Sequence, residues 1–153
     1  MALTILDAGA SRTITTGWLR QAGVLRRLQK VQVMDGGVLR TVATFAPPLT
    51  ASVSPGSVSG SSAGAGPTDT TTNAATASPS GGLGPYTYSW ARISGEPTGA
   101  VNSPTMASTT FTATITPGTQ TADFEVTITD TFGQTATATV TAIFENDPVG
   151  TGV

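Results

Sequence analysis

The sequence predicts an all-β protein in two parts, an N-terminal segment of short β-hairpins and a C-terminal antiparallel β-sandwich. Charged residues make up only 10% of the chain, and Thr, Ser, Ala and Gly dominate it, unlike the Leu-, Glu- and Lys-rich composition of helical bundles. A 14-residue repeat occupies the first third of the sequence. In the remainder, apolar and polar residues alternate with the period of two that is typical of half-buried strands.

The N-terminal repeat has the same residue types at the same positions of three units, without gaps. Glycine recurs at 9, 23 and 37, arginine at 12, 26 and 40, and aliphatic residues at 5, 19 and 33 and at 14, 28 and 42. Asp7–Gly9 and Asp35–Gly37 supply residues that tolerate the positive φ of primed hairpin turns. Residues 1–46 are therefore expected to form three hairpins. Because one unit is too short to bury its own core, stacked units or partner chains should cover it.

Each repeated arginine stands two residues before an aliphatic residue, so both point to one face of their strand. Stacked units would align these arginines in a ladder, which is either a solvated charged face or a surface that meets acidic groups of a neighbouring subunit. Nucleic-acid binding is disfavoured, because only Trp18 could stack on bases there. Trp18 is either local core or interface. The predicted interface residues are Arg12, Trp18, Leu19, Arg20, Leu25, Arg26, Arg27, Leu39 and Arg40.

Residues 47–147 are predicted to form the sandwich, and residues 148–153 a flexible tail. Residues 47–66 have the composition of a linker, but 49–54 is interpreted as a first edge strand that ends at Pro55. Trp90, on a central strand, is expected to be buried. Further strands, separated by turn clusters at a spacing typical of sandwiches, are expected at 71–78, 86–93, 110–115, 123–130 and 136–144.

Two stretches of the C-terminal part resemble the PKD and other immunoglobulin-like domains of surface and phage proteins. They are Gly81-Gly82-Leu83-Gly84-Pro85-Tyr86-Thr87-Tyr88-Ser89-Trp90 and Val126-Thr127-Ile128-Thr129-Asp130-Thr131-Phe132-Gly133-Gln134. In those domains the first forms the strand with the core tryptophan and the second the last hairpin. The resemblance covers roughly residues 48–146 and implies an Ig-like antiparallel β-sandwich. The chain lacks the W-x-F-GDG stretch of the strict PKD pattern and the cysteine pair of antibody domains.

The N-terminal repeat resembles the GG-V-W/L-R/K hairpin repeats of small phage tail and fibre proteins, over residues 1–46. The two resemblances together imply a non-enzymatic phage virion structural protein of the tail tip or fibre region, assembled in the host cytoplasm. It would dock to other virion structural proteins through its repeats and display the sandwich for adhesion to a host cell-surface glycan. Because the repeats cannot bury their own faces, we also expect a homo-oligomer, such as a trimer. The alternatives are a capsid decoration protein and a carbohydrate-binding or adhesin module of a bacterial surface protein.

The composition argues against catalysis and against a bound cofactor. The chain has no histidine and no cysteine, which removes the commonest general base and the commonest zinc ligands, so we expect no enzyme activity, no cofactor and no metal. Asp123, Glu125 and Asp130 could bind calcium, but the first two alternate with core residues as solvated strand residues do. Tyr86 and Tyr88 are candidate glycan contacts, unless one ring faces the core and the other is half-exposed.

Charge is unevenly distributed between the two parts. Residues 1–46 carry six basic and two acidic side chains, a net charge of +4, whereas residues 47–153 carry one basic and seven acidic side chains, a net charge of −6. This asymmetry suggests two parts with different roles. No segment approaches the roughly 18 apolar residues of a membrane span. Residues 1–14 lack the features of a Sec signal, so we expect release with a particle on lysis.

Overall fold

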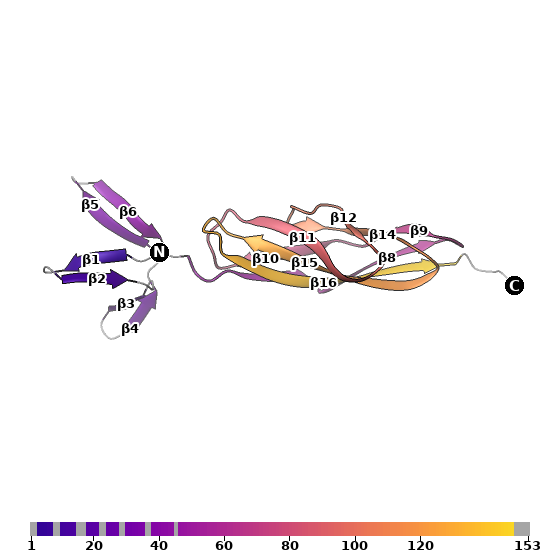
Figure 1. The fold of residues 1–153 in the computed structure, drawn as a ribbon, viewed down its shortest axis with the longest axis horizontal. Coiled ribbons are helices and arrows are strands. Elements are labelled where there is room, and N and C mark those ends of the chain that lie inside the picture. Colours follow the sequence, from indigo (N-terminus) through magenta and orange to yellow (C-terminus); the bar gives the residue numbers. More distant parts are fainter. Residues whose placement is uncertain are drawn as a thin grey trace. The chain divides into compact units, whose positions relative to one another are not determined.

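The computed structural model describes residues 46–148 in full and, before them, the backbone of strands between Leu3 and Thr44. The chain divides into two compact units, Met1–Pro47 and Pro48–Val153 (Figure 1). The regular elements of the described residues are all β-strands, which confirms the predicted all-β fold class. No helix in this part of the chain is long and apolar enough to cross a bilayer. Of the expected tail at 148–153, the residues from Val149 onward lie outside the described part.

The N-terminal unit contains three antiparallel hairpins, as the repeat predicts. Strand β1 pairs with β2, β3 with β4 and β5 with β6, and each pair is a separate two-stranded sheet. Of the expected turn residues, Asp7 and Asp35 end strands β1 and β5, and the repeated glycines lie outside the described residues. The strands span Leu3–Asp7, Ala10–Ile14, Trp18–Gln21, Val24–Arg27, Lys30–Asp35 and Val38–Thr44.

One layer of the sandwich is a four-stranded sheet in the order β11-β15-β16-β8 (Figure 1). Its central strands, β15 (Gly118–Thr129) and β16 (Thr135–Asp147), form a long hairpin, because a turn separates two stretches that alternate apolar and polar residues. Strand β11 (Thr87–Glu96) pairs antiparallel with β15. Strand β8 (Ser57–Ala63) pairs with β16 in parallel.

The other layer consists of two short sheets that follow one another along the same strands, β13-β10-β7 and β12-β14-β9. A backbone hydrogen bond of 2.9 Å from the amide of Thr72 to the carbonyl of Phe111 links them where β9 passes into β10 and β13 into β14. The two sheets therefore form one interrupted layer. Their strands span Thr50–Ser54 (β7), Thr68–Thr71 (β9), Ala75–Ser80 (β10), Ala100–Val101 (β12), Ser108–Thr109 (β13) and Phe111–Ile115 (β14).

The core lies between the two layers and takes alternate residues from their strands. In β15, Phe124, Val126 and Ile128 are fully buried, whereas the residues between them are only partly buried. In β16, Val140 and Ala142 are buried in the same alternating way. The period of two in the sequence thus places one face of each strand in the core.

An aromatic cluster occupies the middle of this core. The ring of Phe111 stacks on that of Phe124 with centroids 4.0 Å apart, and it meets the ring of Trp90 edge-on at 5.9 Å. Trp90 is only 4% exposed, which confirms its predicted burial. Its indole Nε1 donates to the carbonyl of Met106 at 2.9 Å, so the one polar group of the ring is satisfied inside the protein.

Strand β8 departs from the purely antiparallel sandwich that the sequence predicts. It falls in the stretch with linker composition, yet it pairs in parallel with residues 141–147. The chain passes from one layer to the other between β7 and β8 and then runs beside β16 in the same direction. Val58 is the only apolar residue of β8 that is buried. The sequence of β8 therefore lacks the alternation of apolar and polar residues that would identify a strand. Gly60 permits close approach to β9, because a Cβ there would lie 2.2 Å from the carbonyl oxygen of Thr71.

Candidate interaction surfaces

The pairing of the three hairpins repeats with the sequence. The repeated arginines at 12, 26 and 40 stand opposite the repeated aliphatic residues at 5, 19 and 33, respectively. The first hairpin, for example, pairs Arg12 with Ile5. Each unit therefore has the same strand pairing next to its turn as well as the same residue types. The third hairpin differs by a register shift between Val31 and Gln32.

The other predicted interface residues lie on the second and third hairpins. Trp18 pairs with Arg27, and Arg20 pairs with Leu25. Leu39, in the third hairpin, stands opposite Met34. The side chains of these strands lie outside the described residues, so the arginine ladder and the interface role of Trp18 stay predictions.

Each hairpin is complete as a pair but not as a sheet. Within the described strands, no ladder joins one hairpin to another. Both strands of a two-stranded ribbon are edge strands, and each has an outer row of backbone N–H and C=O groups. An isolated hairpin of this kind is at best marginally stable in water. The N-terminal unit is therefore suited to completion by another chain.

At one end of the sandwich, the carboxylate of Asp130 holds two loops together. Asp130 is 5% exposed and accepts hydrogen bonds from the backbone amides of Leu83 at 3.1 Å, Phe132 at 2.9 Å and Gln134 at 2.9 Å, and from Nε2 of Gln134 at 2.8 Å. Leu83 belongs to the loop between β10 and β11, and the other donors to the loop between β15 and β16. The carbonyl of Leu83 accepts bonds from the amide and the hydroxyl of Thr131 at 3.1 and 2.9 Å.

These hydrogen bonds also determine the charge state of Asp130. Burial raises the pKa of its carboxyl, but the bonds from Gln134, Leu83 and Phe132 outweigh burial, so the pKa lies below its ordinary value. The carboxylate is therefore charged at neutral pH, when it accepts all of these bonds. Its role is to fix the loops, which differs from the calcium ligand considered for it above. Among the described residues, no group of three or more candidate ligands is arranged to hold a metal ion.

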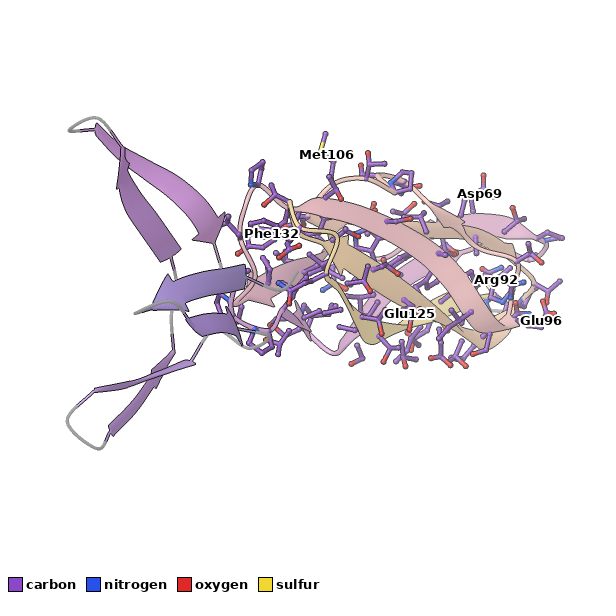
Figure 2. The ribbon with its side chains drawn as sticks, turned by 60° about the vertical axis from the view of Figure 1, so that its left-hand side comes forward. Asp69, Arg92, Glu96, Met106, Glu125 and Phe132 are labelled. Carbon is purple, nitrogen blue, oxygen red and sulfur yellow. The ribbon has the colours of Figure 1, made fainter. Side chains whose placement is uncertain are left out.

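The loop end of the sandwich, defined by Leu83 and Phe132, exposes two large apolar side chains. Leu83 is 42% exposed and Phe132 is 54% exposed. Figure 2 shows Phe132 at this end and Arg92 and Glu96 at the opposite end of the sandwich. Large apolar side chains that are exposed on fixed loops are typical of contact surfaces. The sequence analysis did not identify either residue as a contact residue, because glycine and proline mark their segments as turns. The available signal was a large apolar residue inside a turn cluster.

The candidate glycan contacts, Tyr86 and Tyr88, are both half-buried and pack against the core cluster. The hydroxyl of Tyr86 donates to the carbonyl of Gly81 at 2.7 Å, so part of its hydrogen-bonding capacity is used within the protein. The rings thus match neither a fully exposed stripe nor a division into one core ring and one half-exposed ring. Glycan binding by these residues stays a prediction.

Asp123 and Glu125 lie on the outer face of the four-stranded sheet, opposite the buried face of β15, as the alternation predicts. Asp123 accepts hydrogen bonds from the hydroxyls of Ser94 at 2.7 Å and Thr141 at 2.8 Å. Ser94 first, and then Thr141, lowers the pKa of Asp123 below its ordinary value. Because Ser94 and Thr141 belong to the strands on either side of β15, this carboxylate ties three strands together.

Comparison with known proteins identifies the sandwich. The sequence pattern of the family described as "K319L-like, PKD domain" matches residues 61–143, more than half of the 153 residues. Among solved structures, the chain is similar to a conjugative transposon lipoprotein from Bacteroides eggerthii, with 15% identity, 62% of this chain and 96% of that chain covered, and a TM-score of 0.35. A likeness this distant does not indicate a function. No curated protein matches the chain.

The matched residues begin within β8 and end within β16, so they include both layers of the sandwich. They contain the buried Trp90 and the loop-fixing Asp130, the two residues around which the resembling stretches are built. The family match holds although the W-x-F-GDG stretch is missing from the sequence. The chain belongs to the K319L-like PKD domain family.

Proposed function

We propose that this PKD-domain protein is a non-enzymatic structural component of a phage virion, at the tail tip or fibre. Its N-terminal repeat unit docks to other virion structural proteins and holds copies of the chain together as a homo-oligomer. Its sandwich is displayed for adhesion to the host cell surface, with a glycan as the candidate ligand. The proposal involves no cofactor, nucleic acid or membrane.

The observation that carries the proposal is the contrast between a self-sufficient sandwich and three separate hairpins with the same pairing at 14-residue intervals. The outer edge of a hairpin gains backbone hydrogen bonds when another chain adds a strand to it. Three equivalent hairpins suit a partner whose surface also repeats, as in the symmetric rings and fibres of a particle. The net charge of +4 on residues 1–46 favours an acidic partner surface.

The loop end supports the adhesive part of the proposal. Leu83 and Phe132 are exposed but attached to loops that Asp130 fixes, so a ligand need not order them on binding. One such end offers a small contact area and a weak bond. Several copies on one particle add their weak contacts, because each bond raises the effective concentration of the next.

Multi-angle light scattering in dilute solution tests the assembly role, with residues 1–153 compared to residues 48–153. We expect an oligomer for the full chain and a folded monomer for the shorter one, because the sandwich has a complete core of its own. Full-length protein that stays monomeric and captures no virion protein from a phage lysate would contradict the assembly role.

Immunogold electron microscopy tests the location, with antibodies against residues 48–148 and phage particles produced in bacteria that express the chain's gene. Label at the tail tip or fibres supports the proposal. Label over the head indicates a capsid decoration protein instead. Particles that remain unlabelled, when the antibodies detect the free protein, overturn the virion assignment.

A further inference from the structure

The core of the sandwich becomes polar at the end opposite the loop end. The inward-facing residues of β16 are apolar as far as Phe144, and the next of them, Asn146, is polar. Ser62 of β8 stands beside Asn146 in the parallel register. The hydroxyl of Ser62 bonds to that of Thr70 on β9, which is also buried. Ser62, Thr70 and Asn146 together form the polar end of the core. Each polar group there needs a partner, because burial without one costs stability.

The side chain of Asn146 joins three segments at the polar end. Its Nδ2 donates to the carbonyl of Gly66 at 2.9 Å and to the carbonyl of Ile115 at 3.1 Å. Gly66 lies in the loop between β8 and β9, and Ile115 is the last residue of β14. Both hydrogens of the amide nitrogen are therefore used. These bonds also fix the orientation of the amide, because a rotated amide would direct its oxygen at two carbonyl oxygens.

The oxygen of the same amide, Oδ1, has no donor among the described residues. Asn146 is 0% exposed, so bulk solvent does not reach this atom. Among the buried side-chain nitrogen and oxygen atoms of the described residues, Oδ1 of Asn146 alone has no hydrogen-bond partner. Native proteins pair nearly all such atoms with a protein group or with an ordered water molecule. A donor that reaches Oδ1 inside the core is therefore expected.

A water molecule suits this atom better than a metal ion does. The three side chains of the polar end are uncharged, and the described residues contain no group of three or more candidate metal ligands. A water molecule inside a protein has two to four polar partners, and the polar end also offers the hydroxyl pair of Ser62 and Thr70. Neighbouring strands lie about 4.8 Å apart, so the register that places Ser62 beside Asn146 keeps this pair close to the amide.

We propose that the polar end binds a single buried water molecule, which donates one hydrogen to Oδ1 of Asn146 and forms a second hydrogen bond with the hydroxyl of Thr70. This hydroxyl can donate or accept, because either oxygen can be the donor in its bond with Ser62. Asn146 and Thr70 belong to opposite layers of the sandwich. The water therefore links the two layers where the apolar core ends. The site does not depend on the virion role.

Crystallography of the full chain, at a resolution that shows ordered water, tests the site directly. We expect a water oxygen about 2.7–2.8 Å from both Oδ1 of Asn146 and Oγ1 of Thr70, the usual length of an O–H···O bond. The proposal is overturned if a protein group donates to Oδ1 instead, or if Oδ1 has no partner. A water that contacts Oδ1 but not Thr70 contradicts the link between the layers.

Thr70→Val tests the site in solution, because valine has nearly the shape of threonine but no hydroxyl. Magnetic relaxation dispersion of water counts the water molecules that stay in a protein long enough to tumble with it. We expect the full chain to lose one such water in Thr70→Val. Thr70→Ser, which keeps a hydroxyl, should retain it, as should Thr139→Val at an exposed position of β16.

An unchanged count of long-lived waters in folded Thr70→Val contradicts the proposal. An equal loss in Thr139→Val does so too, because it would mean that the water is not bound at the polar end. Circular dichroism shows whether Thr70→Val is folded. If it is not, the crystal structure of the natural chain decides.

Discussion

The two units of the chain differ in how their strands are completed. In the sandwich, β15 has a partner along its whole length on one side and along most of it on the other, and one face is buried in the core. In the N-terminal unit every sheet stops at two strands within the described residues. The stability of the sandwich is therefore internal, whereas we propose that the repeats are stabilised by assembly. Substitutions that separate these two sources of stability test the comparison.

The largest effect is expected in the core. Phe111→Ala removes a ring that contacts both Trp90 and Phe124, and substitutions of this kind cost about 3–5 kcal/mol of unfolding free energy. Urea denaturation of residues 48–153, followed by Trp90 fluorescence, measures the loss. A loss below about 1 kcal/mol, typical of surface positions rather than cores, would contradict the internal origin of stability.

A smaller effect is expected at the loops, where two glycines form a matched pair. Gly81 and Gly133 both have a φ of 76°, at which a side chain costs about 1–2 kcal/mol. A Cβ on Gly81 would also lie 2.0 Å from the carbonyl oxygen of Pro48, whereas a Cβ on Gly133 meets nothing within 4 Å. Gly81→Ala should therefore lower the melting temperature more than Gly133→Ala. Equal losses would mean that backbone strain alone accounts for both.

Acid is expected to weaken the sandwich through Asp130. A carboxyl with a lowered pKa stabilises the fold above its unfolded-state pKa of about 3.9, and this stability is lost as the pH falls through the folded-state value. Asp130→Asn should reduce the melting temperature at neutral pH and flatten its decline below about pH 4. Asp123, whose pKa is also lowered, should account for part of the remaining slope. Glu145→Gln, at an exposed position, is the control. If Asp130→Asn has the same dependence of melting temperature on pH as the natural protein, the carboxylate of Asp130 does not stabilise the sandwich in this way.

The smallest effect on stability is expected from Arg26→Gln in the second hairpin. It should leave the unfolding of the sandwich within about 0.5 kcal/mol of the natural protein but weaken the association of the full chain and its sensitivity to salt. Arg92→Gln, in the sandwich, removes the same charge from an exposed position and serves as the control. Association that responds equally to both substitutions would reflect net charge rather than the repeat.

The parts of the fold that the sequence predicted are those with strong local patterns. The alternation in β15 and β16 and the position of Trp90 identified a buried face correctly, because core burial imposes a period of two on a strand. The hairpin repeats were equally visible, since their turns and strands recur at fixed spacing. Strand β8 was not, because parallel pairing at an edge with only Val58 buried leaves a Ser- and Gly-rich sequence that looks like a linker.

The loop end was missed because its order depends on residues far apart in the chain. Asp130 accepts a hydrogen bond from Leu83, 47 positions earlier, and no local pattern connects two turn clusters at that distance. Without that connection, Asp130 resembles any surface acid, and Leu83 and Phe132 resemble isolated apolar residues in turns. The function of a buried carboxylate of this kind can be assigned only from its donors.

The parallel pairing of β8 with β16 has a mechanical consequence. The sandwich begins at Pro48, beside the loop end. Strand β16 ends at the opposite end, where the carbonyl of Asp147 accepts a hydrogen bond from the amide of Gly64. Tension applied between Pro48 and a neighbour attached beyond residue 148 would slide β8 and β16 past each other along their length. Their hydrogen bonds would then resist together rather than open one after another. The sandwich should therefore resist a force between its two ends better than a force across its strands, which single-molecule force spectroscopy can measure.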